Sequence, residues 1–196
     1  MTTAPQTSSS LQLIERSPSN TRPRPTVSTE QSELFSRYPL FFRAVAAADA
    51  HPSNIGNFGI QCGPGWYQLI EEAAKQIEHE LRQMWSSQVA NWENIAAIEH
   101  ALLMEQADSV YPVLPVCTDI QQVNGALVIV VVPGFVCDYD SAQWPRLVDI
   151  VQTTREESYS VCESCGNPGR MRKTYWHHVY CDSCIAPIGD IEQPDL

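Results

Sequence analysis

The chain of 196 residues is 43% hydrophobic and 9% aromatic, which is enough to bury a core and argues against wholesale disorder. Its 23 acidic and 12 basic residues give a formal net charge of −11 at pH 7, so non-specific binding to nucleic-acid phosphates is not expected. No apolar run reaches the roughly 18 residues of a membrane-spanning helix, and no basic-then-apolar leader opens the sequence. Without secretion, the seven cysteines indicate metal binding or free thiols rather than disulfides.

The two ends of the chain are expected to lack fixed structure. Residues 1–32 are predicted to form a disordered arm, because Ser, Thr and Pro fill 16 of the 29 positions from 2 to 30. So few apolar side chains cannot offset the entropy lost on ordering. The one apolar cluster, Leu-Gln-Leu-Ile at 11–14, is a candidate docking segment. Residues 187–196 are predicted to form a loose acidic tail.

Residues 33–159 are predicted to form an acidic body. An apolar segment at 34–42 leads into an alanine-rich stretch, which the following Pro and Gly residues are expected to break into a loop. A long helix is predicted next, because apolar residues recur at steps of three and four. A further helix is expected from about Asn91. The stripe of the long helix comprises Trp66, Ile70, Ala73, Ile77, Leu81 and Met84.

Two strands and a last helix complete the predicted body. Residues 112–118 and 126–132 are apolar and rich in β-branched side chains, and Asn124-Gly125 between them is a hairpin signal. The second strand lacks polar alternation, which predicts that both its faces are covered. The last helix is expected over residues 141–158. The predicted fold class is α+β, with helices packed on a small antiparallel hairpin and a zinc ribbon at the C-terminus.

The strongest motif lies in residues 160–186, where two Cys-x-x-Cys pairs are separated by 15 residues. Zinc prefers four tetrahedral ligands, and a Cys-x-x-Cys turn brings two thiolates onto one ion. The intervening residues 170–174 and 175–180 can form a short β-hairpin. This layout predicts a zinc ribbon that holds one structural Zn²⁺ per chain. The predicted ligands are Cys162, Cys165, Cys181 and Cys184.

Other interpretations of the four cysteines are weaker. A disulfide framework needs an oxidising compartment, a thioredoxin-type centre needs only one pair, and rubredoxin-like iron is a minor alternative. His177 and His178 are superfluous beside four thiolates and are predicted to lie on the hairpin surface. Because four sulfurs leave no open coordination position, the metal is expected to be structural and not hydrolytic.

The predicted ribbon also carries the one compact basic cluster of the sequence. Ribbon tips of this kind can contact nucleic acid, and a solvated hairpin edge is the plainer interpretation. Residues 160–185 hold three basic and two acidic side chains, a net of +1, whereas residues 31–159 hold 6 basic and 16 acidic side chains, a net of −10. Direct nucleic-acid binding is therefore the less favoured interpretation. The candidate nucleic-acid or partner contacts are Arg170, Arg172, Lys173 and Trp176.

Cys62 is the candidate nucleophile outside the pairs. It precedes a predicted helix N-terminus, where the helix dipole lowers the pKa of a thiol. The sequence places no histidine beside it, so Gly63 and Gly65 are interpreted as shaping a turn and Trp66 as anchoring the helix. Since no P-loop, GxGxxG, HExxH or GxSxG motif occurs, the protein is predicted not to be an enzyme. The remaining cysteines, Cys117 and Cys137, are predicted to be buried apolar groups.

Four groups of residues carry a resemblance to known proteins. They are Leu34-Phe35 with Tyr38-Pro39, residues 58–67 with Leu69-Ile70, Gly125 with Leu127, and Ser158 with residues 162–169. In their order and spacing, the chain from about Glu33 to Cys184 resembles a family of uncharacterised phage and prophage proteins. It departs from that pattern at residues 121–124, where Gln-Gln-Val-Asn replaces a basic stretch, and in the added arm. The resemblance implies an accessory protein of mobile-element origin in the cytoplasm of a bacterial host, and it implies no reaction.

Three functions fit these features. The first is a non-catalytic module that binds another protein and inhibits or redirects a host or defence protein. The acidic body suits a basic, nucleic-acid-handling partner. The alternatives are a nucleic-acid-binding ribbon protein and a structural component of the virion, with the N-terminal arm laced into neighbouring subunits. No membrane association is expected.

Overall fold

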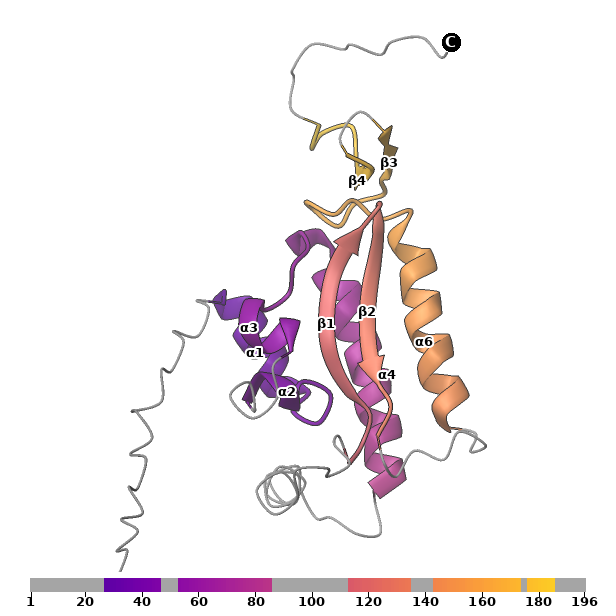
Figure 1. The fold of residues 1–196 in the computed structure, drawn as a ribbon. Coiled ribbons are helices and arrows are strands. Elements are labelled where there is room, and N and C mark those ends of the chain that lie inside the picture. Colours follow the sequence, from indigo (N-terminus) through magenta and orange to yellow (C-terminus); the bar gives the residue numbers. More distant parts are fainter. Residues whose placement is uncertain (1–26, 47–52, 86–112, 135–142, 174–175, 186–196) are drawn as a thin grey trace, which may run out of the picture.

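The computed structural model describes residues 27–46, 53–85, 113–134, 143–173 and 176–185. Within these ranges the protein is an α+β fold of helices with two small antiparallel sheets, as predicted (Figure 1). Several predictions lie outside the described residues. They are most of the N-terminal arm, the helix expected from Asn91, Cys137 and the acidic tail. No described helix is long and apolar enough to cross a membrane.

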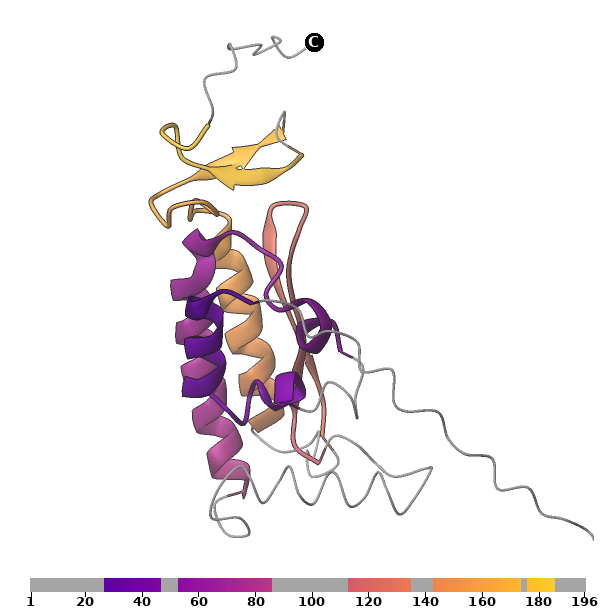
Figure 2. The same cartoon turned by 90° about the vertical axis from the view of Figure 1, so that its left-hand side faces the viewer.

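Two long helices form a layer behind the first sheet. Helix α4 (Tyr67–Trp85) continues a 3₁₀ turn at Pro64–Trp66, and α6 (Gln143–Ser158) lies beside it (Figures 1 and 2). Both predicted helices are confirmed. The predicted stripe of α4 is fully buried from Trp66 to Leu81, because its spacing of three and four residues keeps one face toward the sheet and α6.

The first sheet is a hairpin of β1 (Val116–Val123) and β2 (Ala126–Val132). The predicted Asn124-Gly125 turn is confirmed, with φ angles of 51° and 79° that suit a tight hairpin connection. The first strand was predicted too early, since its polar end at 121–123 pairs with β2 up to the turn. The prediction that both faces of β2 are covered was wrong, because Val130 is 37% exposed.

The first described helix packs against α4, where Arg37 and Tyr38 contact Glu71. Helix α1 (Thr29–Arg37) is capped by the Ser28 side chain, so the structured part begins before the predicted boundary at residue 33. The buried Gln31 amide explains the early start, because it donates to the Ile60 carbonyl at 3.2 Å and accepts from the Ile60 N–H at 3.1 Å. A hydrophobicity pattern does not detect this polar anchor.

Two short helices, α2 (Arg43–Ala46) and α3 (Asn54–Phe58), follow α1 and lie next to β1. The predicted loop at this point was wrong in part, because the Ser53 side chain caps α3 despite Gly56 within it. After α3, Gln61 pairs with the edge of β1. Its N–H donates to the Ile120 carbonyl at 2.8 Å, and its carbonyl accepts from Gln122 at 3.1 Å. This pairing fixes where the chain enters the loop before α4.

The C-terminal cysteine-rich segment, residues 161–184, lies at one end of the molecule beyond the β1–β2 turn and the end of α6 (Figures 1 and 2). Its hairpin pairs β3 (Arg170–Arg172) with β4 (His178–Tyr180), so the predicted hairpin is confirmed with shorter strands. Helix α6 ends just before it. There the Ser158 hydroxyl accepts from the Leu127 N–H at 2.9 Å and ties the helix end to β2.

Candidate metal centre

The four predicted ligands come together in one cluster. The Sγ atoms of Cys162, Cys165, Cys181 and Cys184 all lie within 4.8 Å of one another. They come from two turns that we call the first knuckle, residues 162–166, and the second knuckle, residues 181–184. The β3–β4 hairpin connects the knuckles and brings them face to face. Four cysteines so placed can hold a metal ion.

The spacing of the thiols fits a tetrahedral ion. Zinc–sulfur bonds of about 2.3 Å in a tetrahedron place neighbouring sulfurs roughly 3.8 Å apart. Cys165 Sγ and Cys181 Sγ, which belong to different knuckles, lie 3.6 Å apart. The donor set also fits, because soft thiolates suit zinc, and an all-sulfur tetrahedron suits iron as well.

The thiols of the cluster are not equivalent. Burial raises the pKa of the Cys162 thiol, but hydrogen bonds from the backbone of Cys181, Cys165 and Ser164 outweigh it and lower this pKa to about 7. The hydrogen bond with Cys165 is the main reason why the pKa of Cys184 rises to about 12. The Cys162 thiol therefore loses its proton more readily than an ordinary cysteine, and the thiolate is the form that binds metal.

The first knuckle rests on a loop of the body, residues 62–66, which we call the docking loop. The Gly65 N–H donates to the Glu163 carbonyl at 2.8 Å. A Cβ atom on Gly65 would lie 2.2 Å from the Cys162 carbonyl oxygen and 2.4 Å from the Gly166 nitrogen. Since real Cβ atoms do not approach so closely, only glycine allows the two backbones to meet here.

Glu163, the residue after the first ligand, links three parts of the molecule. Its buried carboxylate accepts from the Gly63 N–H at 3.0 Å through Oε1 and hydrogen-bonds to His178 Nδ1 through Oε2. His178 was predicted to be a plain surface residue, but its ring stacks on Tyr180 and its side chain is only 31% exposed. The sequence analysis did not predict a role for Glu163. The one sequence feature that could have indicated it is the acidic residue between the two cysteines of the first pair.

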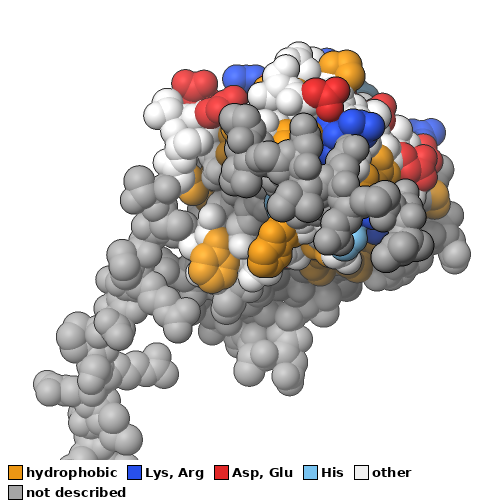
Figure 3. Space-filling view, turned by 90° about the horizontal axis from the view of Figure 1, so that it is seen from above, with side chains coloured by type: hydrophobic (Ala, Val, Ile, Leu, Met, Phe, Trp, Pro, Cys, Tyr) orange, Lys and Arg blue, Asp and Glu red, His pale blue; other side chains and the backbone are white. Residues whose placement is uncertain are grey.

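The predicted basic cluster is largely engaged within the hairpin. Arg170 and Arg172 both pair with Asp182 of the second knuckle, and Arg172 Nε also donates to the Tyr180 carbonyl at 3.2 Å. Lys173 is exposed, and Trp176 is 85% exposed. Figure 3 views the molecule from above, where acidic, basic and apolar side chains are intermixed among the visible described residues. The described residues visible on this face form no continuous basic patch.

Cys62 does not have the features of a nucleophile. Burial raises its pKa to about 12, and the nearby charge of Glu163 adds to the shift. The thiol is therefore protonated at neutral pH, contrary to the helix-dipole argument, because desolvation outweighs the weak field of a 3₁₀ turn. His79, which was a candidate base for this thiol, is exposed on α4, where its ring contacts Gln83. Cys117 is fully buried, as predicted.

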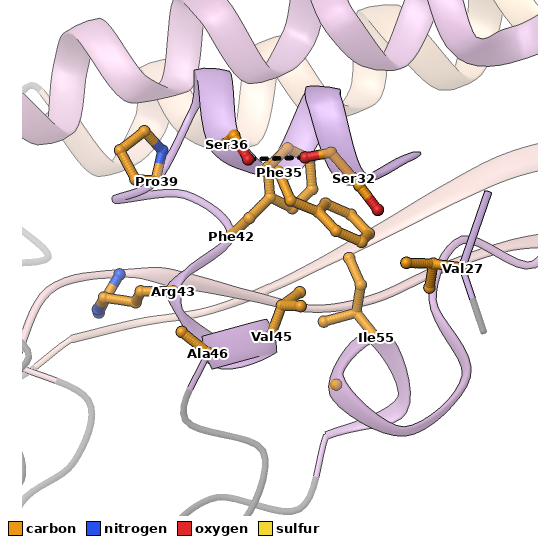
Figure 4. A pocket seen from close by; sticks show the side chains of 11 residues that line it. Val27, Ser32, Phe35, Ser36, Pro39, Phe42, Arg43, Val45, Ala46 and Ile55 are labelled. Carbon is orange, nitrogen blue, oxygen red and sulfur yellow. Dashed lines mark hydrogen bonds between the residues drawn. The ribbon is translucent and has the colours of Figure 1, made fainter. Parts of the chain in front are cut away.

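An apolar cavity of about 490 Å³ lies between α1, α2 and α3, away from the cysteines (Figure 4). Phe35, Phe42 and Ile55 line it, and the nearby Ser36 hydroxyl donates to the Ser32 carbonyl at 2.8 Å. The charged side chain in its lining is Arg43, which is buried and donates to the Pro115 carbonyl at 2.9 Å. The described lining residues contain no acid, base or thiol that could form a catalytic set.

Comparisons with protein-family models, with curated proteins and with solved structures found no match. The resemblance to phage proteins therefore stays a prediction from the sequence.

Proposed function

We propose that the four thiolates bind one structural Zn²⁺ in a zinc ribbon and that the protein acts without catalysis by binding another protein. The observation that carries this proposal is the convergence of four Sγ atoms, two from each knuckle, within 4.8 Å. Cysteine thiolates with this spacing are typical of structural zinc sites. A closed set of four sulfurs leaves the ion no open position for water or substrate, which favours a structural role.

The surroundings of the cluster support a binding role. Trp176 projects from the hairpin turn with 85% exposure and a left-handed φ of 59°. Exposed aromatic residues are enriched at protein interfaces. A strained backbone at an exposed tryptophan favours a functional contact over a packing role. We therefore propose the hairpin tip as part of the binding surface.

The overall charge favours one kind of partner. A chain with a formal net charge of −11 is attracted to a basic surface and repelled by nucleic-acid phosphates. The proposed partner is therefore a basic protein that handles nucleic acid in a bacterial host, in line with the phage-type resemblance. Inhibition or redirection of such a host or defence protein is the role that this pairing would serve.

Two measurements test the proposal. An affinity capture from host lysate, repeated with Trp176→Ala, should retain one protein that the variant loses. A salt-titrated binding assay with DNA and RNA should show no binding at physiological salt. Tight, salt-sensitive binding to nucleic acid, lost in Lys173→Ala, would instead support the nucleic-acid-binding alternative. Detection of the chain in purified particles would support the virion alternative.

A separate variant tests the absence of catalysis. Cys62→Ser replaces the thiol that was the candidate nucleophile with a hydroxyl of similar size, so binding to the captured partner should be unchanged. A large loss of biological activity with unchanged partner binding would revive a role for the Cys62 thiol as a nucleophile.

A further inference from the structure

Glu163 uses all of its polar groups to bridge separate segments. Its N–H donates to the Val179 carbonyl at 2.8 Å, and its carbonyl accepts from Gly65 at the same distance. One carboxylate oxygen accepts from Gly63, and the other contacts His178. A buried carboxylate costs free energy unless such partners compensate it. The residue therefore joins the docking loop, the first knuckle and strand β4 in one network.

The equivalent position of the second knuckle shows no such network. Asp182 follows Cys181 as Glu163 follows Cys162, but its side chain is 83% exposed. Its partners, Arg170 and Arg172, belong to the hairpin itself. The two acidic residues thus occupy the same place in the same motif, and among the described residues Glu163 contacts the body whereas Asp182 pairs within the hairpin.

The docking loop transmits this contact into the core. Trp66 is completely buried, and its Nε1–H donates to the Val161 carbonyl at 2.7 Å, next to the first ligand. It ends the 3₁₀ turn that opens α4. On the other side of the loop, Gln61 is paired to the edge of β1. Any displacement of the first knuckle therefore strains the start of α4 and the edge of β1 together.

We propose that Glu163 is a positioning residue that couples metal binding to the body. Through Gly63 and Gly65, the body holds the first knuckle close to its metal-binding geometry before the ion arrives. The inference rests on the proposed zinc site and adds to it a determinant outside the four ligands. Because coupling is reciprocal, the body raises the metal affinity, and the metal protects the docking loop and the start of α4.

The test compares matched variants of the two knuckles in the full chain. Competition with a chromophoric chelator gives the zinc Kd of the wild type, Glu163→Ala and Asp182→Ala. Loss of a residue that orients metal ligands typically weakens metal binding about 10–100-fold. We expect a zinc Kd at least about 10-fold higher for Glu163→Ala and a change below about 3-fold for Asp182→Ala. Far-UV circular dichroism at saturating zinc verifies that both variants fold.

A conservative pair keeps the test valid if an alanine variant does not fold. Glu163→Gln retains an oxygen that can accept from the Gly63 N–H, so its zinc Kd should lie between those of the wild type and Glu163→Ala. Asp182→Asn should match the wild type. Hydrogen exchange supplies the reciprocal measurement. Removing zinc from the wild type should speed exchange at the amides of Gly65 and Trp66, and the same removal from Glu163→Ala should speed it less.

The zinc Kd values and the exchange rates can each contradict the proposed coupling. Equal Kd values for the Glu163 and Asp182 variants would overturn the coupling, because the residue inside the knuckle would then act only locally. Exchange at Gly65 and Trp66 that ignores zinc would also overturn it. A wild-type chain that takes up no zinc would instead refute the proposed zinc ribbon, so the two failures are distinguishable.

Discussion

The two knuckles have nearly the same sequence and very different surroundings. Cys-Glu-Ser-Cys at 162–165 meets the docking loop through backbone hydrogen bonds and a buried carboxylate, whereas Cys-Asp-Ser-Cys at 181–184 contacts its own hairpin and faces solvent. The Cys-x-x-Cys motif thus places the cysteines, whereas the tertiary contacts of its intervening residues determine how firmly each knuckle is held. The contacts of the first knuckle and those of the second can be removed by separate substitutions.

Loss of a ligand should have the largest effect. Cys165→Ser removes one of four thiolates, and structural zinc sites contribute on the order of 10 kcal/mol to folding. We expect residues 161–184 to unfold and the thermal stability to fall, while α4 and the β1–β2 hairpin stay folded. Circular dichroism and hydrogen exchange measure this. Gly65 and Trp66 should lose protection together with the cysteine-rich segment. If the whole of α4 and the β1–β2 hairpin lose it as well, the protein is one cooperative unit.

Gly65→Ala should be the most disruptive change at the docking loop. The added methyl group would overlap backbone atoms of Cys162 and Gly166, so the loop or the knuckle must move. We expect a loss of about 2–4 kcal/mol in the free energy of unfolding. Pro64→Ala, at an exposed position in the same loop, is the matched control and should cost less than about 1 kcal/mol in chemical denaturation. Equal effects of the two variants would show that the close approach is not needed.

Trp66→Phe isolates the hydrogen bond between the loop and the cysteine-rich segment. It keeps an aromatic ring but leaves the Val161 carbonyl without the Nε1–H donor and opens a small void. A loss of about 1–3 kcal/mol is expected from urea unfolding. Hydrogen exchange should place the increased opening at the first knuckle rather than the second. A uniform increase across both knuckles would contradict the separate roles that we assign to them.

Changes at the second knuckle should be small. Asp182→Ala removes two ion pairs in which the carboxylate is exposed, and solvent and salt screen such pairs so that they contribute little to stability. The free energy of unfolding at moderate salt should therefore stay close to that of the wild type. A loss as large as that of Trp66→Phe would mean that both knuckles are anchored to a similar extent.

A substitution of Glu78 on α4, far from both knuckles, should have the smallest effect and serves as a control. Burial raises the pKa of Glu78 on α4, despite opposing hydrogen bonds from Phe41 and Leu40 and the attraction of Arg82. The folded state therefore binds this proton more tightly than the unfolded state, and its contribution to stability is lost as pH rises through the raised pKa. Glu78→Gln should flatten this slope in unfolding measured over a pH series, and zinc binding should not change. An unchanged slope would contradict the assigned shift.

The comparison of the knuckles also shows what sequence reasoning can reach. The cluster of four cysteines, the Asn124-Gly125 turn and helices α4 and α6 were predictable, because each depends on local spacing or a local backbone requirement. The start of the fold at Thr29 was missed, since it depends on the buried amide of Gln31 reaching Ile60, which lies far away in sequence.

The same limit applies within the site. Gly63 and Gly65 were predictable as turn residues, but their contact with the first knuckle joins segments about a hundred residues apart in the chain. The two arginines of the predicted basic cluster were candidate contacts for a partner because the sequence does not reveal that Asp182 folds back against them. Long-range polar contacts of this kind leave no periodic pattern, so only the tertiary structure displays them.

The most direct test of the central claim is the metal content and metal geometry of the purified full chain. Elemental analysis should give one zinc per chain, and replacement by cobalt should give the absorption spectrum of a tetrahedral ion with four thiolates. Cys165→Ser and Cys184→Ser should each lose that spectrum. A chain that folds and binds its partner with no metal, or that contains iron in place of zinc, would contradict the account.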